Sequence, residues 1–111
     1  MVALTFDGVI IHTGAIYDLP VSKRKAQMIR VKVEAKADVL GRTNALPDIY
    51  DVFIYGKDEI LKVWAQHNDK LPTPPVTCDC QLYGRMKAGK GGEYNNLTLR
   101  LINIKFNYDK A

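Results

Sequence analysis

The sequence has few of the residues from which metal sites and disulfides are built. Among its 111 residues are two cysteines, Cys78 and Cys80, and two histidines. A structural zinc site takes four Cys or His ligands at short spacings, and His12 and His67 lie far apart in the sequence. Cysteines two positions apart on a strand point to the same face, a poor geometry for a disulfide. We therefore expect no metal and no cofactor, and we expect both cysteines to be small core residues.

Long apolar runs are also missing. The longest has four residues, as in Val52–Tyr55, whereas a membrane-spanning helix needs about 20. The residues before Asp7 carry no charged side chain and show no small-residue cleavage pattern, so no secretory signal is expected. The sequence therefore predicts a cytoplasmic protein without a membrane partner.

Side chains that could form a catalytic centre are scattered along the chain. The aspartates show no paired-carboxylate spacing, and neither histidine has a Ser or Cys partner nearby in the sequence. The segment Gly89–Gly92 lacks both the strand–loop–helix context and the Ser or Thr of a phosphate-binding loop. These gaps predict a binding protein and not an enzyme.

Positive charge is concentrated in two blocks. Residues 23–36 hold six Lys or Arg against one Glu, and residues 70–111 hold seven against three acidic residues, within a total net charge of +4. Basic clustering of this kind suits a polyanionic partner such as a nucleic acid.

Alternation of apolar and polar residues is the clearest local signal. It predicts strands over residues 2–11, 27–36, 49–55, 76–85 and 97–106. The first strand is expected to be bent or bulged near Gly8 and Gly14, where alternation fails. Acidic residues in a first turn, followed by apolar residues at helical spacing, predict a short helix over residues 58–67. The predicted connections are residues 40–48, the proline-rich residues 71–75, and residues 87–96, which carry three glycines and two lysines.

This order of elements predicts an all-β fold with one short helix. Five strands, with the helix between the third and the fourth, match a five-stranded Greek-key barrel. The length and the 47% hydrophobic content suit a single domain over residues 1–111.

The same segments resemble a known family. The likeness rests on the basic strand Arg30–Val33, on Tyr50–Tyr55 before the helix, and on Leu82–Lys87, which is joined through Gly91–Tyr94 to Leu97–Ile104. In these segments the sequence resembles the OB-fold single-stranded DNA-binding proteins, especially their small bacteriophage members. The resemblance implies a protein that coats and protects exposed single strands during DNA replication or recombination, without sequence preference.

The end of the sequence departs from the bacterial members of that family. Those members end in a glycine-rich tail with an acidic tip that recruits replication partners, whereas this sequence ends at Asn107–Ala111. This departure favours a bacteriophage protein in the host cytoplasm over a bacterial housekeeping protein, and it counts against recruitment of partners by that route. Replication or recombination proteins stay open as partners. Exposed strand edges of small barrels invite pairing between chains, so we expect a homodimer or a homotetramer.

Single-stranded nucleic acid is held by a basic groove that follows the phosphates and by aromatic rings on which bases stack. The outward faces of the predicted strands and loops supply both kinds of side chain. The candidate contacts are Arg30, Lys32, Arg42, Phe53, Tyr55, Tyr83, Arg85, Lys87, Lys90, Tyr94 and Arg100.

Several aromatic and basic residues have a second interpretation. Phe53 and Tyr55 are alternatively a cover for the second face of the barrel or a dimer contact. The run Lys23–Lys25 is either a solvated loop or a phosphate contact. Trp64 lies at helical spacing from Ile60, so we expect it in the contact between the helix and the barrel.

Two other functions stay open at this point. One is a protein-interaction or structural barrel of a phage or a replisome, and the other is an RNA-binding barrel. A basic and aromatic outer sheet favours a nucleic acid, whereas an apolar and neutral one favours a protein. Nothing in the sequence separates DNA from RNA.

Overall fold

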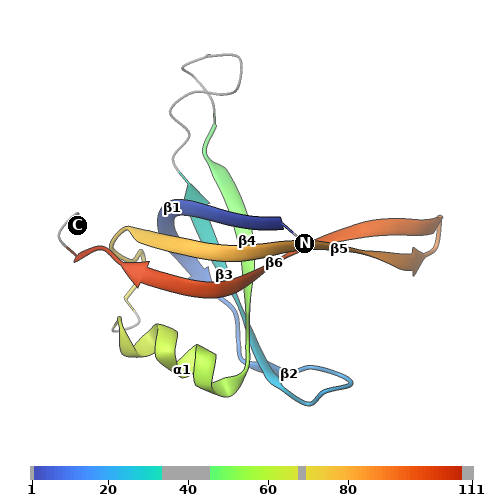
Figure 1. The fold of residues 1–111 in the computed structure, drawn as a ribbon, viewed down its shortest axis with the longest axis horizontal. Helices are drawn as coiled ribbons and strands as arrows, with labels where there is room; N and C mark the ends of the chain where they lie inside the picture. The colour runs from blue at the N-terminus through green and yellow to red at the C-terminus, as the bar shows by residue number, and fades with distance from the viewer. Residues whose placement is uncertain (1, 34–45, 68–69, 109–111) are drawn as a thin grey trace.

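The computed structural model describes residues 2–33, 46–67 and 70–108, which form six strands and one helix (Figure 1). The elements are β1 (Val2–Thr13), β2 (Tyr17–Asp18), β3 (Lys25–Val33), β4 (Asp48–Tyr55), α1 (Lys57–Ala65), β5 (Val76–Gly89) and β6 (Gly92–Phe106). All five predicted strands and the predicted helix are present, and β2 is an addition. Arg42, the last three residues of the predicted strand 27–36 and most of the predicted connection over residues 40–48 lie outside the described residues. No helix within the described ranges is long and apolar enough to cross a membrane.

The strands pair in the order β1-β5-β6-β4-β3-β2, and β1 also pairs with β3. Five strands therefore form a closed circuit of hydrogen-bonded neighbours, with β2 attached beside β3. All pairs are antiparallel except β4 with β6, where Val52 lies opposite Leu99 and Phe53 opposite Arg100. The predicted five-stranded all-β fold is confirmed.

Alternation along the strands fills the interior, because successive side chains point to opposite faces. The core consists of Ile10, Ile29, Val31, Val52, Ile54, Ile60, Val63, Val76, Cys78, Cys80, Ile104 and Phe106. Both cysteines are free thiols in this core, as predicted. Burial raises the pKa of the Cys78 thiol, and it raises the pKa of Cys80 to about 12. Neither side chain is therefore a reactive thiolate at neutral pH.

Helix α1 packs against one end of the barrel, below β6 in the view of Figure 1. It buries Ile60 and Val63, which are one turn apart on the same face. Trp64 packs against the core, and its Nε1 donates a hydrogen bond of 2.8 Å to Oε1 of Gln27 on β3. Nε2 of Gln27 in turn donates to the carbonyl oxygen of Gly14 at 3.0 Å. The predicted position of Trp64, between helix and barrel, is confirmed.

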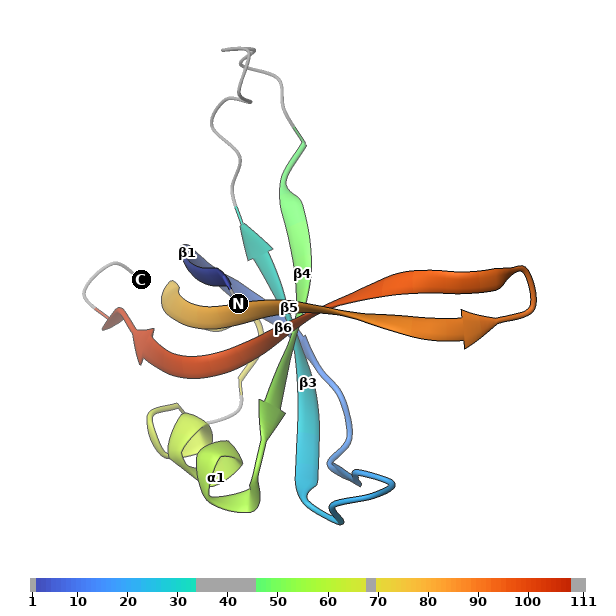
Figure 2. The same ribbon diagram turned by 45° about the vertical axis from the view of Figure 1, so that its right-hand side comes forward.

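The predicted glycine-rich loop over residues 87–96 is wrong. Strands β5 and β6 continue as one ladder as far as the pair Gly89 and Gly92, so the turn holds only Lys90 and Gly91. Gly92 has a φ of +111°, which lets the chain reverse tightly without steric cost. Ladder hydrogen bonds need no apolar side chains, and for that reason hydrophobic alternation did not reveal this extension. Figure 2 shows the β5–β6 hairpin projecting from the barrel on the side away from α1.

Strand β1 changes partner along its length, and this change closes the barrel. Residues up to Gly8 pair with β5, and residues from Val9 onward pair with β3. The irregularity that we predicted near Gly8 and Gly14 lies between them, as a register shift between Ile10 and His12. At Gly8 the two backbones come close, because a Cβ there would lie 2.6 Å from the carbonyl oxygen of Lys32.

We predict that Gly8→Ala destabilises the protein by about 1–3 kcal/mol, because the added methyl group collides with a backbone atom that can only move by distorting the closure. Chemical or thermal unfolding of the variant measures this loss. The matched control is Gly91→Ala in the hairpin turn, where a Cβ meets nothing within 4 Å. That variant should differ from the wild type by no more than about 0.5 kcal/mol, and equal stability of both variants would contradict the prediction.

Candidate nucleic-acid interface

The outer face of β4, β5 and β6 brings five of the predicted residues together. Directly opposed residues share a face of a sheet, and Phe53 of β4 lies opposite Arg100 of β6. Arg100 in turn lies opposite Gln81 of β5, two positions before Tyr83. We define the central group by these strands' outward aromatic and basic side chains. Its members are Phe53, Tyr55, Tyr83, Arg85 and Arg100.

Ring and guanidinium contacts connect the central group. Phe53 and Tyr55 are stacked with their ring centroids 6.3 Å apart and an interplanar angle of 15°. The Arg100 guanidinium lies 5.5 Å from the centroid of the Tyr55 ring, and the Arg85 guanidinium lies 5.0 Å from that of Tyr83. Positive charge is attracted to the faces of aromatic rings, so these contacts favour the observed side-chain positions. The result is an aromatic surface with two cations on it.

Within the central group, Tyr55 has the most strongly shifted pKa. Burial, and next the hydrogen bond with Tyr83, raises the pKa of Tyr55 to about 12, and the nearby Arg100 opposes this rise. Tyr55 is therefore a neutral phenol at any physiological pH. Cations that lie beside this uncharged ring suit a phosphate-bearing ligand.

The two predicted cations of β3 lie on the same outer face but are less available. Arg30 is directly opposite Asp51, and its Nε lies 2.8 Å from Oδ1 of that carboxylate. The hydrogen bond with Asp51 raises the pKa of Arg30. Lys32 follows two positions along β3, opposite Ile49. Met28 lies opposite Phe53, so the residue of β3 directly beside the central group is apolar and not a cation.

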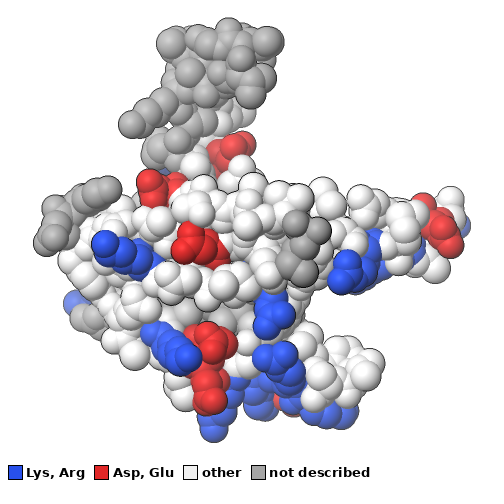
Figure 3. Space-filling view, viewed as in Figure 1, with Lys and Arg blue, Asp and Glu red and all other residues white. Residues whose placement is uncertain are grey.

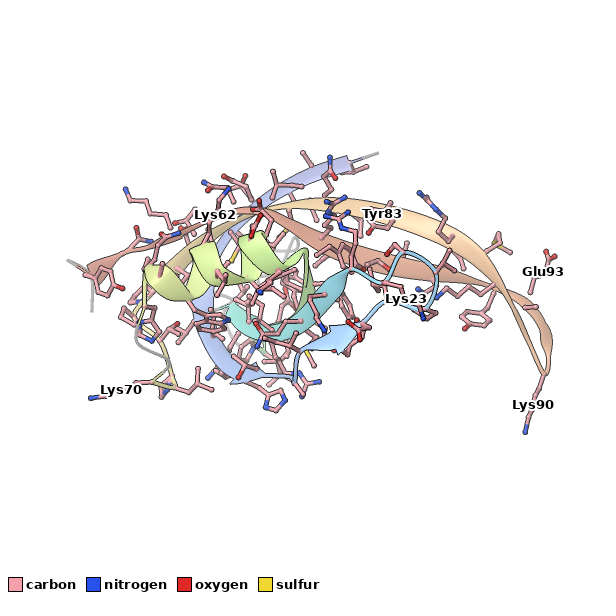
Figure 4. The ribbon with its side chains drawn as sticks, turned by 90° about the horizontal axis from the view of Figure 1, so that it is seen from below. Lys23, Lys62, Lys70, Tyr83, Lys90 and Glu93 are labelled. Carbon is pink, nitrogen blue, oxygen red and sulfur yellow. The ribbon has the colours of Figure 1, made fainter. Side chains whose placement is uncertain are left out.

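Lys87, Lys90 and Tyr94 lie on the projecting hairpin instead of a loop. Lys87 and Tyr94 are directly opposed, and the Tyr94 ring packs over Gly89, where a Cβ would meet it at 3.1 Å. All three side chains are exposed. Figure 4 shows Lys90 and Glu93 at the far end of the hairpin, well away from Tyr83. The hairpin is therefore an arm that extends from the central group.

Sequence reasoning missed Tyr17, which lies on the same outer face. Strand β2 is two residues long, too short for an alternating pattern, and it is recognised only by its pairing with β3.

Within the described ranges no three His, Cys, Asp or Glu side chains are grouped so that they could hold a metal ion.

No protein-family model matches the sequence, and the search of curated proteins finds no match. Solved structures do match. The small single-stranded DNA-binding protein from Streptomyces coelicolor has a TM-score of 0.64 at 14% identity, over 99% of this chain and 97% of that one. The mitochondrial single-stranded DNA-binding protein Rim1 from S. cerevisiae has a TM-score of 0.65 at 8% identity, over 95% and 93%. The Plasmodium falciparum SSB complex with ssDNA has a TM-score of 0.64 at 14% identity, over 94% and 92%.

The chain has the OB-fold of these proteins. The expected OB-fold is thereby confirmed over nearly the whole chain. At identities of 8–14%, a structural match shows only that the fold is shared. Function depends on the side chains of the outer face.

The environment of Tyr55 gives a prediction for alkaline pH. In the unfolded chain a tyrosine loses its proton near pH 10, whereas Tyr55 in the folded protein holds it until about pH 12. Between these values the unfolded state binds fewer protons, so the free energy of unfolding falls as the pH rises. We predict that Tyr55→Phe makes this fall shallower, as measured by denaturant unfolding across that pH range.

Tyr83→Phe is the comparison variant, because it removes the hydrogen bond and leaves Tyr55 buried. With Tyr83→Phe the free energy of unfolding should also fall less steeply with pH than in the wild type. The change in steepness should be smaller than with Tyr55→Phe. A Tyr55→Phe variant that loses stability as steeply as the wild type would contradict this account of the Tyr55 environment.

Proposed function

We propose that this protein binds single-stranded DNA without sequence preference, and that it acts by binding and not by catalysis. The observation that carries the proposal is the central group, in which stacked rings and two ring-bound guanidinium groups share one face of the barrel. The structural likeness to a complex with ssDNA supports the same partner.

The rings and the arginines of the central group contribute to binding in different ways. Phe53, Tyr55 and Tyr83 present rings on which bases stack, and one stacked base contributes about 1–3 kcal/mol. Arg85 and Arg100 contact phosphates, which releases counterions and supplies affinity that does not depend on the base. Every base has a π-face, so this combination tolerates any sequence. Lys87, Lys90 and Tyr94 on the hairpin provide further contacts along the strand.

The wider role follows from the same surface. A protein that covers bases and phosphates without reading them would protect exposed single strands during replication or recombination, in the cytoplasm of a cell or of a phage-infected host. Assembly as a homodimer or homotetramer would let one particle cover a longer strand. The likeness of the sequence to small bacteriophage members motivates the viral part of this proposal.

Affinity for single-stranded oligonucleotides should fall steeply with salt. Several cations from the set Arg30, Lys32, Arg85, Lys87, Lys90 and Arg100 would displace counterions, and each phosphate contact contributes about 0.7 to the slope of log affinity against log salt. A binding titration at several salt concentrations measures the slope. Arg85→Ala and Arg100→Ala should each make the slope shallower by about 0.7, because each removes one phosphate contact.

Competition in the same titration distinguishes the alternatives. Unlabelled single-stranded DNA should displace the probe, whereas duplex DNA should not. Displacement by RNA alone would assign the site to RNA. An affinity that does not change with salt, or no binding at low salt, would refute the proposal and favour a protein-interaction barrel.

The rings make a second prediction. Phe53→Ala and Tyr55→Ala should each weaken oligonucleotide binding by about 1–3 kcal/mol, because each removes a stacking platform. Both side chains are only half-buried, so the barrel should remain folded. Binding, thermal melting and size-exclusion chromatography on the same samples measure the three effects separately.

Tyr108→Ala is the matched control, because Tyr108 is an exposed aromatic residue beyond the end of β6, next to Phe106. It should bind as tightly as the wild type. If Phe53→Ala and Tyr55→Ala fold normally and also bind normally, the binding groove lies on another face. A loss of about 3 kcal/mol or more of stability, or a changed oligomer, would instead identify the rings as core or interface residues.

A further inference from the structure

Apolar side chains form a hollow beside α1. Ile16, in the connection between β1 and β2, and Ile60 and Leu61 of the helix line a hollow of about 200 Å³ together with Lys25 and Lys57. Lysine side chains carry long aliphatic stems, so the walls of the hollow are largely apolar. Ile16 is 54% exposed and Leu61 is 57% exposed. Both side chains therefore present apolar surface that a partner would remove from water.

The hollow continues along the helix. A second hollow, of about 260 Å³, is lined by Thr13, Ile16, Gln27 and Trp64. Ile16 lines both hollows, and Leu61 and Trp64 are three positions apart on α1, so the two hollows lie side by side along one face of the helix. We call them together the α1 groove. A concave, largely apolar surface of this kind suits the side chain of a ligand.

One end of the α1 groove is basic. A neighbouring hollow at the start of α1 shares Lys25 and Lys57 with the groove. Its charged side chains are Lys23, Arg24, Lys25, Lys57, Asp58 and Glu59. Lys25 is paired with Asp18 at 2.8 Å. Glu59 is paired with Lys62 at 3.3 Å.

The positive charge at this end is available to a ligand. Among the described residues no carboxylate pairs with Lys57, which is exposed. Figure 3 shows Lys and Arg side chains gathered at the lower edge of the molecule, around the start of α1 and the β2–β3 turn. An apolar groove with a positive end complements a partner that carries both apolar and acidic side chains.

The α1 groove and the central group lie on opposite sides of β3. Gln27 of β3 lines the groove. Its neighbour Ala26 lies opposite Tyr55, and its other neighbour, Met28, lies opposite Phe53. Successive residues of a strand point to opposite faces, so the groove opens away from the rings of the central group. A ligand on those rings leaves the groove uncovered.

We propose that the α1 groove is the docking site for a protein partner, an acidic peptide segment that inserts a large apolar side chain between Ile16 and Leu61. The carboxylates of the segment lie at the basic end, near Lys57. Bases stack on rings, whereas the exposed side chains of the groove are aliphatic, so a peptide fits this surface better than a nucleic acid does. This inference goes beyond the proposed function, because it adds a second partner that binds while the outer face holds DNA.

The test uses a short, fluorescently labelled peptide in which glutamates flank a Leu-Phe pair. Trp64 is the only tryptophan of the chain, so its indole N–H gives one local NMR signal in the groove. We expect the peptide to bind and to shift that signal. Replacing the glutamates by glutamine, or Leu-Phe by Ser-Ser, should each weaken binding about 5-fold or more, because each removes one half of the complementarity.

Two variants with matched controls locate the site. Leu61→Gln should bind the peptide about 5- to 10-fold more weakly, whereas Ile102→Gln, at a half-exposed aliphatic residue of β6, should bind like the wild type. Lys57→Glu should weaken binding about 3- to 10-fold. Lys105→Glu makes the same change in net charge at an exposed position of β6 and should have little effect. All four positions are exposed, so we expect each variant to melt like the wild type.

The result that supports the inference is peptide binding that shifts the Trp64 signal, depends on Leu61 and Lys57, and keeps its affinity when the protein is saturated with oligothymidylate. No shift at millimolar peptide, or equal binding by folded Leu61→Gln, would overturn it. Displacement of the peptide by single-stranded DNA would assign the groove to nucleic acid. A changed oligomeric state of Leu61→Gln in size-exclusion chromatography would assign it to a second copy of this chain.

The proposed function is tested separately by the oligonucleotide titrations. A protein that binds the peptide and no single-stranded DNA would refute the proposed function and leave the docking site standing. A protein that binds single-stranded DNA and no peptide would do the reverse.

Discussion

The pairing of β4 with β6 is the contact on which both the core and the candidate site depend. It joins segments almost fifty residues apart in the sequence, and it is the only parallel pairing among the described strands. Val52 opposite Leu99 faces the interior, and the next pair, Phe53 opposite Arg100, faces outward. Side chains alternate with a period of two, so a slip of one residue would move Arg100 toward the core. Burial of Val52 therefore also fixes the position of Arg100 beside the stacked rings.

The outer face carries exposed aromatic rings that are held in defined positions. Exposed rings on a small barrel invite aggregation unless they are held in place, and here guanidinium groups lie over two of the tyrosines. The same cations that would bind phosphates thus cover the rings that would stack bases. On β3, by contrast, Asp51 pairs with Arg30 and reduces the positive charge that is available to a ligand. The binding surface that we propose is consequently centred on β4, β5 and β6 and not on β3.

Low sequence identity to structures with the same fold is understandable in physical terms. Closure of this barrel depends on alternation along the strands and on a close approach of two backbones at Gly8. Many different side chains satisfy the alternation, as long as their volumes fill the interior. The architecture can therefore be shared at 8–14% identity, whereas a binding function depends on a few outward side chains at defined positions.

The sequence by itself determined the five main strands, the helix, the burial of Cys78 and Cys80, and the contact of Trp64 with the barrel. It also determined that Phe53 and Tyr55 point away from Val52 and Ile54. These features follow from local periodicity, which is read along one segment at a time. Only the tertiary structure decided that Arg30 meets Asp51 and that residues 87–96 form a hairpin. It also decided that Tyr17 lies opposite Ala26, whose neighbour on the other side is Tyr55. The partner and register of a strand are set by distant segments that must close the barrel together, and local periodicity carries no information about them.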